Sequence, residues 1–118
     1  MMGIVTGTIL LRNARVPTIA LQVGAIADTR TVHLCIPEKI RERLQLEPVA
    51  ERELTLTDGT KKVVPYVGPV EIRFKTRVCF VGALVIGDKV LLGSIPMEDM
   101  DLIVLPRARR LDLQKPGQ

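Results

Sequence analysis

Asp28 is the residue best placed for acid–base chemistry, because an apolar stretch leads directly into Ala27-Asp28-Thr29 and Arg30 follows. A positioned carboxylate can act as a base toward water. Two other features stand later in the chain: an Asp-Gly pair within Thr57, Asp58, Gly59 and Thr60, and an apolar run that ends in Leu91, Leu92 and Gly93. Each is unspecific alone, since Asp28-Thr29 is more often a turn at a strand end. Their joint order carries the argument.

His33 and Cys35 offer a second possible chemistry, a thiol nucleophile activated by histidine. Their spacing places them on one face of a strand, but no third group that would orient the histidine is evident. Cys35 and Cys79 both lie in apolar surroundings without other ligands at metal spacing. We therefore expect two buried thiols, a packed or partly exposed histidine and no metal.

Alternating apolar residues predict the hairpin that delivers Asp28. Residues 4–11 are rich in β-branched and aliphatic side chains, residues 12–15 are polar enough to turn, and residues 18–27 alternate as a second strand. A short helix is expected from Pro37 to Leu44, because proline suits a first helical position and Ile40 and Leu44 lie one turn apart. Pro48 then forbids its continuation.

Asp58-Gly59 between apolar arms predicts a second, projecting hairpin, because both turn positions tolerate positive φ. Pro65 cannot donate a ladder hydrogen bond, so the second arm should be an edge or leave the central sheet near its end. A third hairpin is expected from residues 70–74 and 78–86, turning at Lys75-Thr76-Arg77. Residues 90–93, a short turn or helix at 96–100 and a last strand at 102–105 follow, and residues 107–118 are expected to form a basic, partly flexible tail.

The composition is that of one globular domain, with 118 residues, 47% apolar and 25% charged. The net charge of +4 is gathered partly in Arg107, Arg109 and Arg110, and only Phe74, Phe80 and Tyr66 are aromatic, which disfavours a small nucleic-acid-binding barrel. There is no basic, apolar leader and no apolar run of about 18 residues, so a cytoplasmic protein without a membrane partner is expected.

The order of these motifs resembles one lobe of the retropepsin-like (clan AA) aspartic proteases, in the single-lobe form of prokaryotes. In that family a strand ends at Asp-Thr-Gly, a flap hairpin follows, and a hydrophobic-hydrophobic-Gly motif precedes a short helix and a closing strand. Asp28 and Thr29 match the triplet, Thr57 to Thr60 match the flap, and Leu91 to Gly93 match the second motif, over roughly residues 4–106. The resemblance implies a mostly β, closed-barrel lobe at residues 1–106 with one or two short helices.

The resemblance also implies a cofactor-free aspartic endopeptidase that works as a homodimer on extended peptides. Two Asp28 carboxylates would meet at a two-fold axis, share one proton and activate a water, with Thr29 hydrogen-bonding across the axis. Arg30 departs from the family glycine: its charge would favour two ionised carboxylates, and its bulk would replace a residue that packs tightly and offers its amide. The alternative is a catalytically impaired dimeric domain that still binds peptides.

Overall fold

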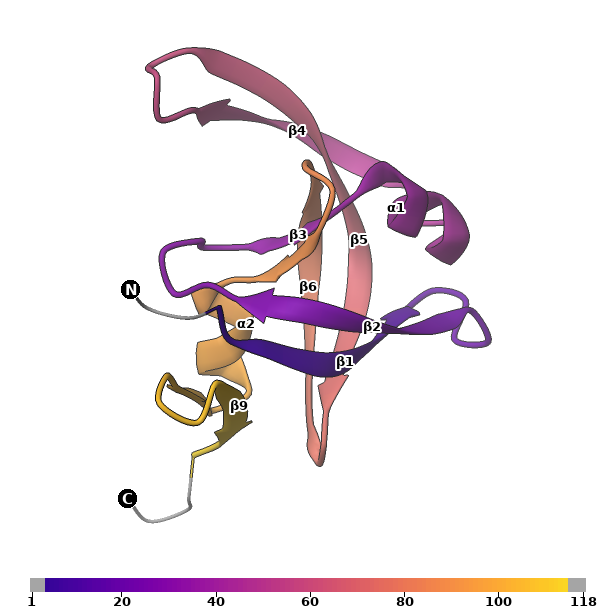
Figure 1. Cartoon of the computed structure of the whole chain (residues 1–118). Helices are drawn as coiled ribbons and strands as arrows, with labels where there is room; N and C mark the ends of the chain where they lie inside the picture. Colours follow the sequence, from indigo (N-terminus) through magenta and orange to yellow (C-terminus); the bar gives the residue numbers. More distant parts are fainter. Residues whose placement is uncertain (1–3, 115–118) are drawn as a thin grey trace.

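The computed structural model describes residues 4–114, and these form a mostly β fold (Figure 1). The strands are β1 (Thr6–Asn13), β2 (Ala20–Ala27), β3 (Leu34–Ile36), β4 (Pro48–Thr55), β5 (Lys61–Phe74), β6 (Arg77–Val85), β7 (Val90–Leu92), β8 (Leu102–Leu105) and β9 (Arg110–Leu113). The two short helices are α1 (Glu38–Leu44) and α2 (Ser94–Asp99). The expected closed barrel with short helices is confirmed.

Six strands close the barrel, in the order β1-β2-β7-β3-β6-β5 and back to β1. β2 pairs with β7 and β3 pairs with β6 in parallel, whereas the other neighbours around the barrel are antiparallel. Alternate residues of each strand point inward and fill the barrel with aliphatic side chains. The largest of those that are fully buried include Ile9, Leu11, Leu34, Ile36, Ile72 and Leu92.

The predicted hairpins and the predicted helix are present. β1 pairs with β2 from Thr6↔Ile26 to Arg12↔Ala20, and β5 turns into β6 at Lys75 and Thr76. Helix α1 begins at Glu38 with Pro37 as its N-cap, one residue later than expected, and buries Ile40 and Leu44. It ends because Gln45 adopts a left-handed conformation at φ 54°, three residues before Pro48 opens β4.

Several boundaries differ from the sequence expectations. β1 extends through Arg12 and Asn13, which were expected to turn, and α2 spans Ser94–Asp99 rather than 96–100. Two larger differences concern β5 and the expected tail. β5 runs unbroken through Pro65, so the second arm of the Asp58-Gly59 hairpin and the strand at 70–74, expected as separate strands, are one strand. Proline has no N–H to donate to a neighbouring strand. Pro65 is tolerated here because it pairs with Glu51 of β4, whereas the pairing of β5 with β6 begins one residue later, at Tyr66. The expected tail contains β9, which pairs with β8 and places Leu111 in the core at 2% exposure. Residues 115–118 of that expected tail lie outside the described residues.

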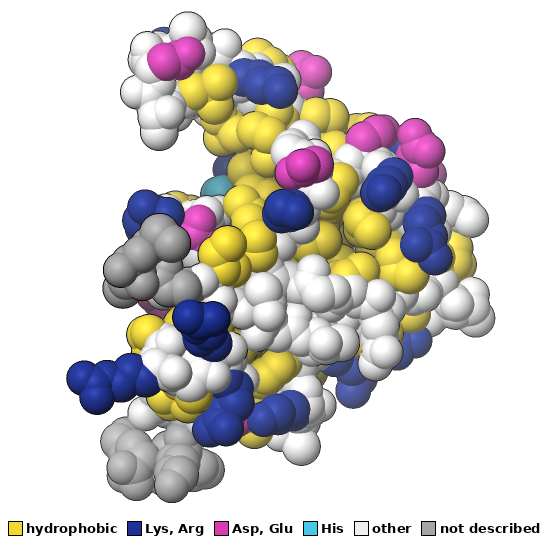
Figure 2. All heavy atoms as spheres, in the orientation of Figure 1, with side chains coloured by type: hydrophobic (Ala, Val, Ile, Leu, Met, Phe, Trp, Pro, Cys, Tyr) yellow, Lys and Arg dark blue, Asp and Glu magenta, His cyan; other side chains and the backbone are white. Residues whose placement is uncertain are grey.

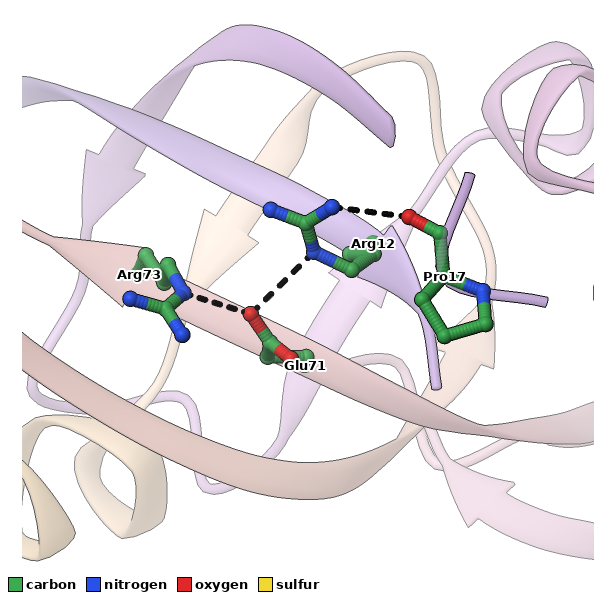
Figure 3. A network of polar contacts seen from close by, with 4 residues as sticks. All are labelled: Arg12, Pro17, Glu71 and Arg73. Atoms are coloured by element: carbon green, nitrogen blue, oxygen red, sulfur yellow. Dashed lines mark hydrogen bonds and ion pairs between the residues drawn. The ribbon is translucent and has the colours of Figure 1, made fainter. Parts of the chain in front are cut away.

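A network of charged side chains holds the seam where β1 meets β5 and the barrel closes (Figure 3). Glu71 Oε2 accepts hydrogen bonds from Arg73 Nε at 2.6 Å and from Arg12 Nε at 3.2 Å. Arg12 also donates to the carbonyl of Pro17 at 2.7 Å, which ties the β1–β2 turn to the same seam. The hydrogen bond from Arg73, strengthened by the Arg12 contact, lowers the pKa of Glu71 against the effect of its burial.

Within residues 4–114, no helix is long and apolar enough to cross a membrane.

Candidate active site

The end of β2 and the end of β7 bring the first and second motifs together. The Asp28 amide donates to the Leu92 carbonyl at 3.0 Å, and the Ser94 amide donates to the Thr31 carbonyl at 2.7 Å. Gly93 lies against the loop that follows Asp28: a β-carbon at Gly93 would lie 2.6 Å from the Val32 carbonyl carbon and 2.7 Å from the Thr31 oxygen. Only glycine allows this approach, so Gly93 helps to position the Asp28 loop.

The Asp28 carboxylate is held by Arg30 and Thr31, two residues of the loop that follows it. Its Oδ1 accepts the Arg30 amide and its Oδ2 accepts the Thr31 hydroxyl, each at 2.9 Å. The Arg30 Nε lies 3.6 Å from Oδ1, although the Arg30 side chain is 92% exposed. Burial alone raises the pKa of Asp28, but these hydrogen bonds and the Arg30 charge outweigh it and lower that pKa below its ordinary value.

Arg30 interacts with Asp28 through both its side chain and its backbone amide. The cation of Arg30 does point toward Asp28, as the electrostatic argument requires. The expectation that an arginine would deny its amide to the carboxylate is wrong, because the Arg30 amide already donates to Asp28. Thr31 was missed as a site residue; an Asp followed three residues later by Thr is a turn signal that could have pointed to it.

The site opens on the outer wall of the barrel rather than into its core. Strand register places Ile26, Leu91 and Cys35 on one side of the wall, since each pairs directly with the next. Their neighbours Ala25 and Leu92 are 1% and 0% exposed and belong to the core. Asp28 lies two residues after Ile26, just beyond the end of β2. Because side chains alternate along a strand, the Asp28 side chain lies on the same outer side as that of Ile26.

The β4–β5 hairpin projects from the barrel on the side of the loop between β2 and β3, and Figure 2 shows a hollow between the two. At its tip, Asp58 Oδ1 accepts the amide of Thr60 at 2.9 Å and its hydroxyl at 2.6 Å. Gly59 has φ +85°, whereas Asp58 does not have positive φ, so the turn differs from the expected form with two positive values. Thr57 and the rest of the tip are exposed. The predicted hairpin is confirmed.

A second apolar cluster lines the base of this hairpin, separate from the barrel core. Its buried members are Cys35, Val64 and Leu84, and Leu54, Tyr66, Ile86 and Leu91 pack against them. Burial, and then the negative charge of Asp28, raise the pKa of the Cys35 thiol. The cluster therefore gives Asp28 an apolar neighbourhood beneath the hairpin.

The alternative thiol chemistry finds little support in this arrangement. The His33 ring faces the ring of Tyr66 edge-on at 6.3 Å, and burial followed by the charge of Arg52 lowers the pKa of His33. Both cysteines are buried and free, and burial raises the pKa of Cys79 to about 12. A thiol whose pKa is raised is a poor nucleophile. Among the described residues, no group of side chains has the composition of a metal site.

Thr29 lies apart from the carboxylate and faces outward. It is exposed, and it lines a shallow pocket of about 390 Å³ formed mainly by helix α2 and strand β8. β8 is an end strand of the sheet, paired on one side with β9, and its four residues Leu102–Leu105 are all only partly buried. An apolar edge strand therefore lies beside Thr29.

A scan against models of known protein families gave no match, and a search of curated proteins found no similar sequence.

Proposed function

We propose that this chain is one subunit of a homodimeric aspartic endopeptidase of the retropepsin-like kind, with Asp28 as its catalytic residue. The observation that carries the proposal is the placement of Asp28. Its carboxylate is fixed by the Arg30 amide and the Thr31 hydroxyl, where the ends of β2 and β7 meet. The loop between β2 and β3, which carries Asp28, borders a hollow under the β4–β5 hairpin (Figure 2), and an apolar cluster lines the base of that hairpin.

The proposed chemistry needs two Asp28 carboxylates with one proton between them. The ionised carboxylate takes a proton from a water molecule as the water oxygen bonds to the scissile carbonyl carbon. The protonated carboxyl donates its proton to the carbonyl oxygen. The tetrahedral intermediate then collapses, a proton passes to the amide nitrogen, and the carbon–nitrogen bond breaks to release an acid and an amine.

A dimer follows from this chemistry, because each chain supplies one Asp28. Thr29, exposed beside the apolar edge strand β8, is available to hydrogen-bond across a two-fold axis. Within residues 4–114 the second edge of β8 has no strand partner. Such an apolar edge favours association with another strand, and a two-fold operator would pair like surfaces. Two buried free thiols suit a reducing compartment such as the cytoplasm.

Arg30 supports a second candidate, a dimeric peptide-binding domain without hydrolysis. Its guanidinium lies 3.6 Å from Asp28 and contributes to lowering the pKa of that carboxyl. A lowered pKa disfavours the shared proton on which the reaction depends. Such a domain would keep the groove and the dimer and lose only the acid–base step.

Cleavage of a diverse peptide library by the wild-type protein, by Asp28→Asn and by Arg30→Gly separates these candidates. The peptidase predicts cleavage by wild type or Arg30→Gly, strongest in mildly acidic buffer, and none by Asp28→Asn. Sedimentation of the same samples tests the dimer. A species that stays monomeric at high micromolar concentration, even with a peptide inhibitor, would contradict both candidates.

A further inference from the structure

We infer that the groove beneath the β4–β5 hairpin selects extended peptides that carry an acidic side chain, which Arg52 and Lys62 bind from the underside of the hairpin. This inference rests on the proposed peptide groove and names the class of ligand that the groove takes.

Strand register sorts the hairpin residues onto two faces. Arg52 pairs with Val64 and Leu54 pairs with Lys62, so these four side chains share one face. Val64 is 2% exposed and Leu54 packs on the apolar cluster, which shows that this face is turned toward the barrel. We call it the inner face.

The charges differ between the two faces. Glu51 and Glu53 alternate with Arg52 and therefore lie on the outer face, where Glu53 meets Lys61 at 3.5 Å. The charged residues on the inner face are Arg52 and Lys62, both cationic. Neither has a carboxylate within 4.0 Å among residues 4–114. The inner face therefore presents two cations without an acidic partner.

Arg52 is held in place by the groove wall. Its guanidinium carbon lies 4.2 Å from the centre of the Tyr66 ring, a stacking distance that orients the side chain while leaving its N–H donors free for a carboxylate. Its charge reaches His33 at the edge of the same hollow and helps to lower the pKa of that histidine. Arg30, on the loop that follows β2, is already engaged with Asp28.

The groove thus divides into an apolar part and a basic part. Leu91 and Ile86 are partly buried members of the apolar cluster and suit apolar side chains beside the scissile bond. Arg52 and Lys62 come from the hairpin and suit a side chain further along the peptide. Because side chains of an extended peptide alternate, a peptide with an apolar centre and a flanking acidic residue fits both parts.

Calorimetric titration of two synthetic peptides tests the inference. Each has two central leucines, and they differ only in carrying glutamate or glutamine at the flanking positions. Asp28→Asn serves as the protein background, so that binding is measured without turnover. The glutamate peptide should bind about three- to tenfold more tightly than the glutamine peptide, and about 0.5 M salt should remove most of the difference.

Three substitutions on that background locate the effect. Arg52→Gln should remove most of the preference for glutamate, Arg52→Lys should keep part of it, and Lys62→Gln should reduce it. Lys61→Gln is the matched control, because it removes a cation from the outer face of the same hairpin. Equal binding of the two peptides, or an equal loss of preference in Lys61→Gln and Arg52→Gln, would overturn the inference.

The outcome also separates this inference from the peptidase proposal. Cleavage of both peptides by the protein with Asp28 intact, without any preference for glutamate in binding or KM, would overturn the inference and leave the peptidase standing. Preferential binding of the glutamate peptide without cleavage by wild type or Arg30→Gly would support the inference and contradict the peptidase.

Discussion

Replacing Thr31 with valine removes the hydroxyl that donates to Asp28 Oδ2 at 2.9 Å, at almost constant volume. A hydrogen bond to a charged group contributes about 1.5–3 kcal/mol when well buried. The Asp28 side chain is 24% exposed, so we expect Thr31→Val to lower the free energy of unfolding by about 1 kcal/mol at pH 7. For 118 residues the entropy of unfolding is roughly 0.25 kcal/mol/K, which makes the expected fall in Tm about 4 °C.

The stability lost in Thr31→Val should become smaller as the pH is lowered. The pKa of Asp28 is lowered in the folded protein, so the stability that this carboxylate contributes is present above its unfolded pKa, about 4. That stability is lost as pH falls through the lowered folded pKa. The difference between wild type and Thr31→Val should therefore be complete at pH 7 and smaller at about pH 3, measured by urea unfolding at one protein concentration.

A double-mutant cycle isolates the hydrogen bond from other effects of the valine. An alanine at position 28 accepts no side-chain hydrogen bond, so Thr31→Val should have almost no effect in the Asp28→Ala background. If Thr31→Val lowers the free energy of unfolding equally with and without the Asp28 carboxylate, and equally at both pH values, the proposed hydrogen bond from Thr31 to Asp28 is refuted.

Three further predictions concern the same loop and the hairpin above it. Arg30→Gly should raise peptidase activity, because it removes the cation that lowers the pKa of Asp28; failure of a folded, dimeric variant to cleave any peptide between about pH 4 and 7 would favour the binding domain. Gly93→Ala should lower the free energy of unfolding, measured with urea, by about 1–3 kcal/mol, because its β-carbon would overlap the backbone at 31–33. Gly24→Ala is the control and should have little effect, because nothing lies within 4 Å of its β-carbon. Amides of Thr57–Thr60 should exchange hydrogen faster than those of 81–85, and equal protection would contradict a mobile hairpin tip.

The strands and hairpins were predictable because their signals are local. Alternation over residues 18–27, the Asp-Gly pair and the polar turn at Lys75 each depend on neighbouring residues. The continuity of β5 was not predictable in this way. Whether Pro65 breaks a strand depends on which strands flank it, and here β6 pairing begins only at Tyr66. Strand β9 was missed for a similar reason, since its short apolar pattern gains meaning only beside β8.

The candidate site was predictable in its parts but not in its contacts. The sequence shows Asp28 and Gly93 far apart, and the contact between their loops depends on the parallel pairing of β2 with β7. The roles of Thr31 and of the Arg30 amide depend on how one loop folds back on its own carboxylate. The two cations on the inner face of the hairpin depend on register, because a shift of one residue would turn Arg52 outward.

The distance between the two Asp28 carboxylates in the dimer tests the central claim most directly. It can be measured in a crystal structure of the protein with a bound peptide inhibitor that carries a hydroxyl in place of the scissile amide. The peptidase predicts a two-fold dimer with carboxylate oxygens about 3 Å apart, both in contact with the hydroxyl. A dimer that separates the two carboxylates beyond the reach of one bridging water, or an inhibitor bound to a single chain, would contradict it.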